Sequence, residues 1–149
     1  MRQGSYSYKV KAMAAEFFPI YYISPVFDTL ISQIKPVLQE RFAFHALHTP
    51  DLEKADFSSP QILLCGLPEF EVLQQRTDLS SALATILSLE ADQPFQAEWS
   101  DLPWLAEYSQ EKITPARLTF ILNRLYSISL TQQEMTRLAD QIDKQHHRL

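Results

Sequence analysis

The sequence predicts an α/β protein: a doubly wound, five-stranded parallel sheet with a C-terminal helical extension. Three observations lead to this fold. Short runs of β-branched and aromatic residues alternate with segments of helical periodicity. Two of the runs, at 61–65 and 84–89, are apolar at nearly every position, as in strands buried on both faces. Two expected helices begin with serine or threonine followed by proline, at 24–25 and 114–115. Strands alternating with helices indicate right-handed crossovers and parallel neighbours.

The first strand is predicted at "FFPIYYI", residues 17–23. Ser24 and Pro25 then suit an N-cap and a first helical position, so a helix is expected to begin directly. Its apolar residues recur at steps of three and four, which predicts one buried face, and Pro36 should bend the helix or remove a hydrogen bond. That face consists of Phe27, Leu30, Ile31, Ile34, Val37 and Leu38.

The remaining elements are expected in the same rhythm. A short strand at 42–47 precedes a short polar helix or turn within 49–60, and "QILLC" (61–65) is the central strand. A helix-like stretch at 69–83 leads into the strand at 84–89. Residues 90–107 are the least regular, and a weak last strand is expected at 106–110. The final helix should begin at Thr114-Pro115, and its inner face consists of Leu118, Ile121, Leu122 and Leu125.

Composition limits the class of protein. A chain of 149 residues that is 46% hydrophobic can bury one sizeable core, so one globular domain is expected. Its single cysteine excludes an intramolecular disulfide. No run resembles a signal-peptide core or a membrane span, which favours a cytoplasmic protein with no membrane partner.

Charge and glycine content exclude further classes. The chain has a formal net charge of −5, and its three bases within residues 1–15 leave the folded part still more acidic. Such a surface repels phosphate backbones, so no direct nucleic-acid binding is expected. Gly4 and Gly66 are the only two glycines, which is too few for a dinucleotide fingerprint or a Walker loop.

Three segments are therefore expected. Residues 1–15 form a disordered or added tail, with Met13 as an alternative start. Residues 16–129 form the folded domain. Residues 130–149 form a C-terminal helix, a linker or the start of a coiled coil. In doubly wound sheets the functional crevice lies beyond the carboxyl ends of the strands. The residues predicted there are Ser24, Cys65, Gly66, Ser88 and Glu111.

The order of these pieces, over about residues 17–128, resembles the receiver domains of bacterial two-component response regulators. The best local match is "YSQEKITPARL" (108–118), which fits the family's last strand and last helix without a gap. On this resemblance Tyr108 takes the position of the aromatic switch and Ser88 that of the hydroxyl switch. Glu111 and Lys112 stand where the family has its lysine and proline.

The residues that carry a receiver's chemistry are missing. Ser24 and Pro25 stand where the family's acidic pair holds Mg²⁺, and the phosphoacceptor aspartate is replaced by Leu64, Cys65 or Gly66. Mg²⁺ requires carboxylate oxygens as ligands. Phosphoryl transfer in turn requires the metal ion, which neutralises the negative charge of the phosphoryl group. The resemblance thus implies a pseudo-receiver: not an enzyme, without metal or cofactor, and independent of phosphorylation.

Alternatives remain open for several residues. Cys65 is either a small buried hydrophobe or a redox-sensitive thiol, and the alternative function is a small α/β enzyme or redox sensor that uses it. An enzyme of this kind needs an anion-binding turn, which Pro68 and Glu69 oppose. Tyr108 is either an interface residue or a half-buried aromatic at the edge of the sheet. Glu111 and Lys112 form either a polar switch or ordinary solvated surface. The histidines lie at 45, 48, 146 and 147, without the nearby set of Cys, Asp or Glu residues that a metal site needs.

The C-terminal segment predicts contact with another protein. Thr131 and Glu134 fit a capping box, so a new helix is expected to begin at Thr131. Met135, Leu138 and Ile142 lie near one stripe, which suits a dimer, although a helix that folds back or frays remains an alternative. In the resembling family, such a helix often leads to an output domain, commonly a diguanylate cyclase, a kinase or a DNA-binding module. The expected function is a non-catalytic signalling domain that acts through a protein partner or a homodimer.

Overall fold

The computed structural model describes residues 17–148, with residues 146–148 in their backbone only. The tail expected at 1–15 lies outside these residues. The chain divides into a sheet unit that ends at Pro115 and a helical unit that begins at Ala116, and each unit is described by itself.

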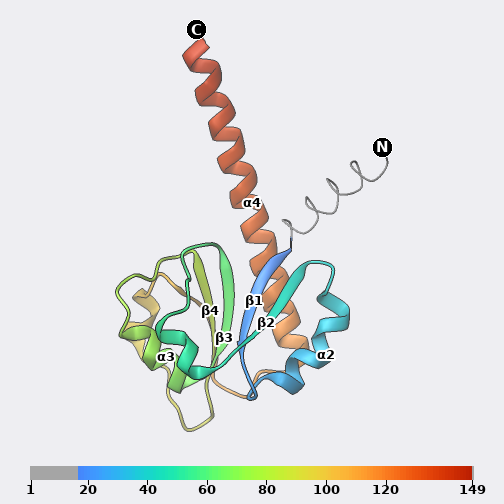
Figure 1. The fold of residues 1–149 in the computed structure, drawn as a ribbon, viewed down its shortest axis with the longest axis vertical. Helices are drawn as coiled ribbons and strands as arrows, with labels where there is room; N and C mark the ends of the chain where they lie inside the picture. The colour runs from blue at the N-terminus through green and yellow to red at the C-terminus, as the bar shows by residue number, and fades with distance from the viewer. Residues whose placement is uncertain (1–16, 149) are drawn as a thin grey trace. The chain divides into compact units, whose positions relative to one another are not determined.

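The sheet unit confirms the predicted fold class. Its single sheet has five strands in the order β2-β1-β3-β4-β5, and all neighbouring strands are parallel (Figure 1). This is the order of flavodoxin-like and receiver folds. The strands are β1 (Phe18–Ile23), β2 (Phe42–Leu47), β3 (Gln61–Cys65), β4 (Leu83–Ser88) and β5 (Leu105–Ser109).

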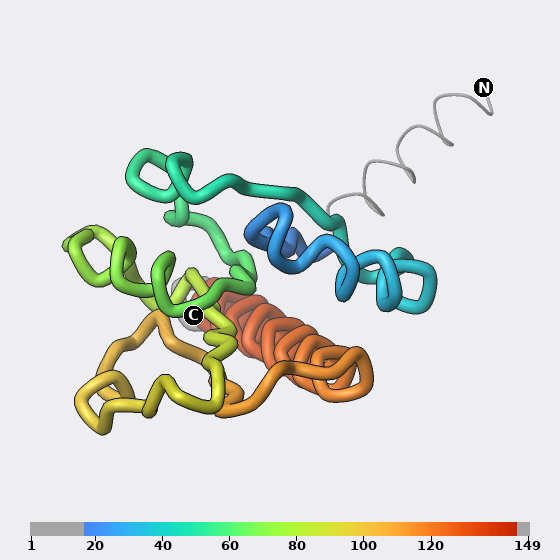
Figure 2. The backbone as a smooth tube through the Cα atoms, turned by 90° about the horizontal axis from the view of Figure 1, so that it is seen from below, coloured from blue at the N-terminus to red at the C-terminus, as the bar shows by residue number. Residues whose placement is uncertain are grey.

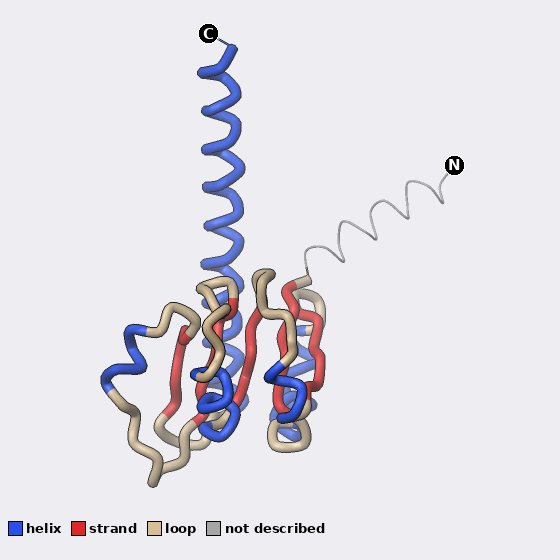
Figure 3. The backbone as a smooth tube through the Cα atoms, turned by 60° about the vertical axis from the view of Figure 1, so that its left-hand side comes forward, coloured by secondary structure: helices blue, strands red, loops and turns tan. Residues whose placement is uncertain are grey.

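The connections change direction at β1, because β2 lies on one side of it and β3 on the other. Right-handed crossovers then place α2 (Asp28–Leu38) on one face of the sheet, and η1 (Thr49–Glu53) and α3 (Leu67–Gln74) together on the other (Figure 2). Figure 3 shows the five strands as one layer with these segments around it. The last connection contains η2 (Ala97–Asp101).

Strand β3 is the centre of the core. All five of its residues are buried, as its two-sided apolar pattern predicts. Gln61 is the polar exception, and its side-chain amide donates hydrogen bonds to the carbonyl oxygens of Asp56 (3.3 Å) and Ser59 (2.8 Å). The buried amide is thereby satisfied by the loop that leads into the strand.

An aromatic cluster fills the face of the sheet that α3 covers. Phe70 of α3 contacts the rings of Trp99 and Trp104, at centroid distances of 5.0 and 5.2 Å. Phe95 contacts Trp99 in turn, at 5.4 Å. The irregular segment between β4 and β5 is thus held by aromatic packing rather than by a long helix.

Two expectations about α2 are wrong. Ser24 and Pro25 do not begin the helix: residues 24–27 form a turn that contains a cis Ser24–Pro25 peptide bond, and the helix begins at Asp28. The amide of Phe27 donates to the Ile23 carbonyl (3.1 Å), which closes this turn. Val37 was expected on the buried face but is 73% exposed, whereas Ile31, Ile34 and Leu38 are buried. Pro36 lies inside the helix, two residues before its end.

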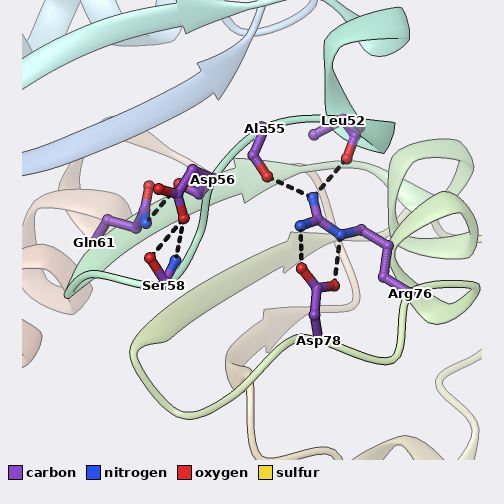
Figure 4. A network of polar contacts seen from close by, with 7 residues as sticks. All are labelled: Leu52, Ala55, Asp56, Ser58, Gln61, Arg76 and Asp78. Carbon is purple, nitrogen blue, oxygen red and sulfur yellow. Dashed lines mark hydrogen bonds and ion pairs between the residues drawn. The ribbon is translucent and has the colours of Figure 1, made fainter.

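The side chain of Arg76 joins the segments on both sides of α3 (Figure 4). It donates to the backbone carbonyl oxygens of Leu52 (2.9 Å) and Ala55 (2.7 Å) and forms an ion pair with Asp78 (2.6 Å). The guanidinium also lies 5.1 Å from the centre of the Phe57 ring. This arrangement fixes the loop after η1 against the end of α3.

The described part of the helical unit belongs to one continuous helix, α4 (Pro115–Arg148), whose first residue is the last of the sheet unit. Pro115 is its first residue, as predicted, but no new helix begins at Thr131. The Thr131 hydroxyl donates to the Ser127 carbonyl one turn earlier (3.0 Å), and Glu134 pairs with Arg137 instead of capping an N-terminus. No proline or glycine follows Pro115, so nothing in the sequence interrupts the helix. Within residues 17–148, no helix is long and apolar enough to span a membrane.

Candidate functional site

The carboxyl ends of the five strands are the place where this fold carries its ligand sites, at the point where the strand order reverses between β1 and β3. The residues predicted there come from the segments that follow β1, β3, β4 and β5. Ser24, Cys65, Gly66, Ser88 and Glu111 thus end or follow four parallel strands, along one edge of the sheet.

The turn after β1 offers backbone and hydroxyl groups but no carboxylate. The amide of Ser24 donates to the carbonyl of Leu47 at the end of the neighbouring strand β2 (2.8 Å). Ser24 is half-buried and Pro25 is exposed. A turn held by this hydrogen bond therefore stands where an acidic pair would be needed, and it offers no carboxylate to bind a metal ion.

Cys65 and Leu64 end the central strand and are both buried, at 0% and 1% exposure. Burial raises the pKa of the Cys65 thiol far above its ordinary value, and the negative charge of Glu69 raises it further. The thiolate is the nucleophilic form, and this environment disfavours it. The thiol therefore lacks both the access and the ionisation that redox or nucleophilic chemistry requires.

Glu69 completes this part of the edge as a helix cap, a role that was not predicted from the sequence. Its carboxylate accepts a hydrogen bond from the backbone amide of Gly66 (3.0 Å), and its side chain is buried at 7% exposure. A Cβ on Gly66 would lie 3.3 Å from this same oxygen, so glycine gives the carboxylate room. The signal was present: a glutamate three residues after an N-cap is the mark of a self-capped helix.

The capped N-terminus of α3 has a chemical consequence. The first amide groups of a helix attract anions, which is how many folds hold phosphate. Here the chain's own carboxylate takes that place. An incoming phosphate would have to displace Glu69 or accept its repulsion.

The two switch-like positions do not face each other. In the register between β4 and β5, Tyr108 pairs with Leu87, and Ser88 pairs with Ser109. Successive side chains of a strand alternate between faces, so Ser88 and Tyr108 point to opposite faces of the sheet. Tyr108 stacks on Phe95, with ring centroids 3.8 Å apart and planes 10° from parallel, and stays 38% exposed.

Gln110, which follows β5, holds the loop that follows β4. Its side-chain amide nitrogen donates to the carbonyl oxygens of Glu90 (3.1 Å) and Gln93 (2.5 Å), and its oxygen accepts from the amide of Phe95 (3.1 Å). These bonds fix the ring on which Tyr108 stacks. The stack and the loop together hold Tyr108 in one position.

Glu111 and Lys112 are exposed at the end of this edge. The hydroxyl of Ser109 donates to the Glu111 carbonyl (2.6 Å), so the backbone rather than the carboxylate is engaged here. Within the described part of the chain, no three His, Cys, Asp or Glu side chains are grouped to hold a metal ion. His45 is exposed and stacks on Tyr21 at 5.0 Å, whereas the side chains of His146 and His147 are outside the described ones.

Helix α4 presents the residues that the sequence assigned to a dimer contact. Met135, Leu138 and Ile142 are exposed at 64%, 44% and 55% of their surface, and Ile128, one heptad before Met135, is exposed at 46%. By contrast, Leu118, Ile121 and Leu122 near the start of the same helix are buried. The apolar surface of the second half of α4 is therefore open to another molecule.

Comparison with known proteins assigns this chain to no family, because neither a family model nor a curated protein matches it. Apart from the sequence match over residues 108–118, the likeness to receiver domains consequently rests on the strand order.

Proposed function

We propose that this chain is a degenerate receiver: a non-catalytic, phosphorylation-independent regulatory domain that acts by self-association or by contact with another protein. In this role it controls an output module, such as a diguanylate cyclase, a kinase or a DNA-binding domain. The observation that carries the proposal is the row of exposed apolar residues on α4. Removing these side chains from water is favourable, and it requires a second surface to cover them.

The edge of the sheet supports the non-catalytic part of the proposal. A phosphoacceptor needs an accessible carboxylate and a metal beside it, whereas the end of β3 has a buried thiol and a glycine. The Glu69 carboxylate caps α3, and Tyr108 is stacked in place. No residue of this edge is set to accept or to report a phosphoryl group.

The phosphorylation-independent part is tested with a small phosphodonor. The intact chain is incubated with acetyl phosphate and Mg²⁺, and separately with beryllofluoride and Mg²⁺. The expected result is an unchanged mass and unchanged fluorescence of Trp99 and Trp104, which both contact Phe70 of α3. A phosphoprotein mass shift, or a fluorescence change that requires Mg²⁺, would contradict the proposal.

The association part is tested on full-length variants by sedimentation at tens of micromolar. The intact chain is expected to dimerise, and Leu138→Asp is expected to be a monomer because it places a charge in the apolar row. Gln133→Asp is the matched control: it adds the same charge to an exposed position on the opposite side of the helix and should leave the dimer intact. A monomeric wild-type chain would leave only contact with a different protein.

The alternative function, a redox sensor or enzyme that uses Cys65, has no observation in its favour, since the thiol is buried and its pKa is raised. Rapid labelling of the native protein by a thiol reagent, without unfolding, would revive it.

A further inference from the structure

The apolar row on the second half of α4 follows a heptad repeat. Ile128, Met135 and Ile142 are seven residues apart, and Thr131, Leu138 and Gln145 each follow three residues later. All six side chains are exposed, and they lie on one continuous α-helix. Apolar residues at the first and fourth positions of a heptad are the pattern by which two helices pair along a left-handed seam.

We infer that the partner of this row is a second copy of the same helix, parallel and in register over residues 128–145. The inference rests on the proposed function, and it specifies the partner and the geometry of the contact. Isoleucine at the first heptad position with leucine at the fourth is the combination that favours two parallel strands. Here Ile128 and Ile142 occupy the first position, and Leu138 the fourth.

The matching of layers favours the parallel arrangement. In register, each residue of the row meets its own copy, so the two polar members, Thr131 and Gln145, meet polar partners. An antiparallel arrangement that overlaps the same row would set Thr131 against Ile142 and Gln145 against Ile128. Burying an amide against isoleucine leaves its hydrogen-bonding groups unpaired, which is costly, whereas two facing glutamine amides can bond to each other.

The Thr131 hydroxyl does not oppose burial in this seam. It already donates to the Ser127 carbonyl within its own helix (3.0 Å). Threonine can therefore enter the contact with its methyl group forward and its donor satisfied.

The residues that flank the row carry no like charges toward each other. In a parallel pair, Glu134 of one helix lies beside Ala139 of the other, and Gln132 lies beside Ser127. Glu134 also pairs with Arg137 on its own helix, with the Nε–Oε2 distance at 3.1 Å. The remaining charged residues of this stretch, Asp140, Asp143 and Lys144, lie outside the flanking positions.

Disulfide trapping tests the orientation on the full chain. Thr131→Cys and Leu138→Cys each place one thiol in the row, and a parallel in-register pair brings each thiol opposite its own copy, within reach of a disulfide. Under mild oxidation, both variants are expected to shift from the monomer band to a linked-dimer band on a non-reducing gel. Gln133→Cys, on the far side of the helix, should remain a monomer band. The wild-type chain controls for the buried Cys65.

The outcomes separate this inference from the proposed function. Sedimentation of the wild-type chain comes first, and a monomer there would overturn this inference and leave the proposed function to rest on contact with a different protein. A dimer in which neither row variant links, while a mixture of Met135→Cys and Leu138→Cys does, would establish an antiparallel pair and overturn only the inference. Linking of Gln133→Cys as complete as that of Thr131→Cys would place the contact elsewhere and overturn it as well.

Discussion

Cys65, at the end of β3, has no exposed surface, whereas Met135 and Ile142 of α4 leave 64% and 55% of theirs open to water. The first region is the one where an α/β sheet of this order carries its chemistry, and here the chain's own groups occupy it. The second lies outside that conventional site and carries apolar side chains without cover. The difference teaches that the carboxyl edge of the sheet is closed by the chain's own groups, whereas the second half of α4 keeps apolar surface exposed.

The two regions also differ in how their polar groups are satisfied. At the sheet edge, Glu69 and Gln110 make bonds to backbone amides and carbonyls, so each holds a segment of chain in place. On α4, the ion pair of Glu134 and Arg137 and the bond of Thr131 remain within the helix. The edge is therefore fixed by bonds between segments, whereas these bonds of α4 tie the helix only to itself.

The largest expected effect on stability comes from Phe70, the aromatic side chain of α3 in the core of the sheet unit. Phe70→Ala removes the ring that Trp99 and Trp104 contact, and it should lower the free energy of unfolding by about 3–5 kcal/mol. Phe120→Ala, which truncates a ring that is 62% exposed on α4, should change stability little. Urea unfolding followed by circular dichroism measures both.

If Phe70→Ala does not fold, Phe70→Leu keeps most of the apolar volume and provides the measurement. Equal losses for Phe70→Leu and Phe120→Ala would break the comparison, because the helix surface would then matter to folding as much as the edge.

A smaller effect is expected at Arg76. Its two bonds to backbone carbonyls of the η1 segment are charge-assisted and its side chain is 13% exposed, so Arg76→Ala should cost about 2 kcal/mol. Arg137→Ala on α4 removes only an exposed ion pair within one helix and should leave the urea midpoint unchanged. A similar shift for both would mean that the bonds of Arg76 to Leu52 and Ala55 contribute nothing beyond a surface pair.

The sequence was sufficient for the sheet because its signals are local. The strand β3 is apolar at nearly every position, and Thr114-Pro115 precedes a helix, so these elements follow from period and capping rules. The start of α2 was misplaced because Ser24-Pro25 suits both a helix start and a turn, and tertiary contacts decide between them. The same holds for Thr131, whose hydroxyl bonds backward within a helix as readily as it caps one.

The positions of the candidate site residues along the sheet edge were predictable, but their burial and contacts were not. Chain order places Cys65 and Gly66 at the edge, but burial of the thiol depends on what packs above it, which no local pattern encodes. The roles of Glu69 and Gln110 depend on distances between segments, such as the 17 positions between Gln110 and Gln93. Residues that act across such separations are visible only in the folded chain.

The raised pKa of Cys65 predicts how stability depends on pH. The folded state keeps the thiol protonated, whereas the unfolded chain releases the proton near the ordinary thiol pKa of 9.0. The unfolded state is thus favoured as pH rises above 9, and the thiol's contribution to the loss should approach about 1.4 kcal/mol per pH unit. Denaturation midpoints measured from pH 7 to pH 10.5 give the slope.

Cys65→Ala is the control for this slope, since it removes the titrating group. The variant should be less stable at pH 7 because it leaves a small void, but its stability should fall less steeply above pH 9. Equal slopes for the two proteins would show that the thiol ionises freely in the folded state and that the edge is more open than its burial indicates.

The smallest expected effect is local and concerns the loop that Gln110 holds. Gln110→Ala removes the acceptor of the Phe95 amide and the donor to Glu90 and Gln93, which should lower the local opening free energy by about 1 kcal/mol, or speed amide exchange roughly fivefold. Hydrogen exchange read by NMR at the Phe95 amide measures this. The Leu89 amide, which bonds to the Ser109 carbonyl at 2.8 Å, is the internal control and should keep its rate. If both amides exchange faster, the loop and the strand ends open as one unit, and the position of Tyr108 then depends on the whole edge rather than on this one side chain.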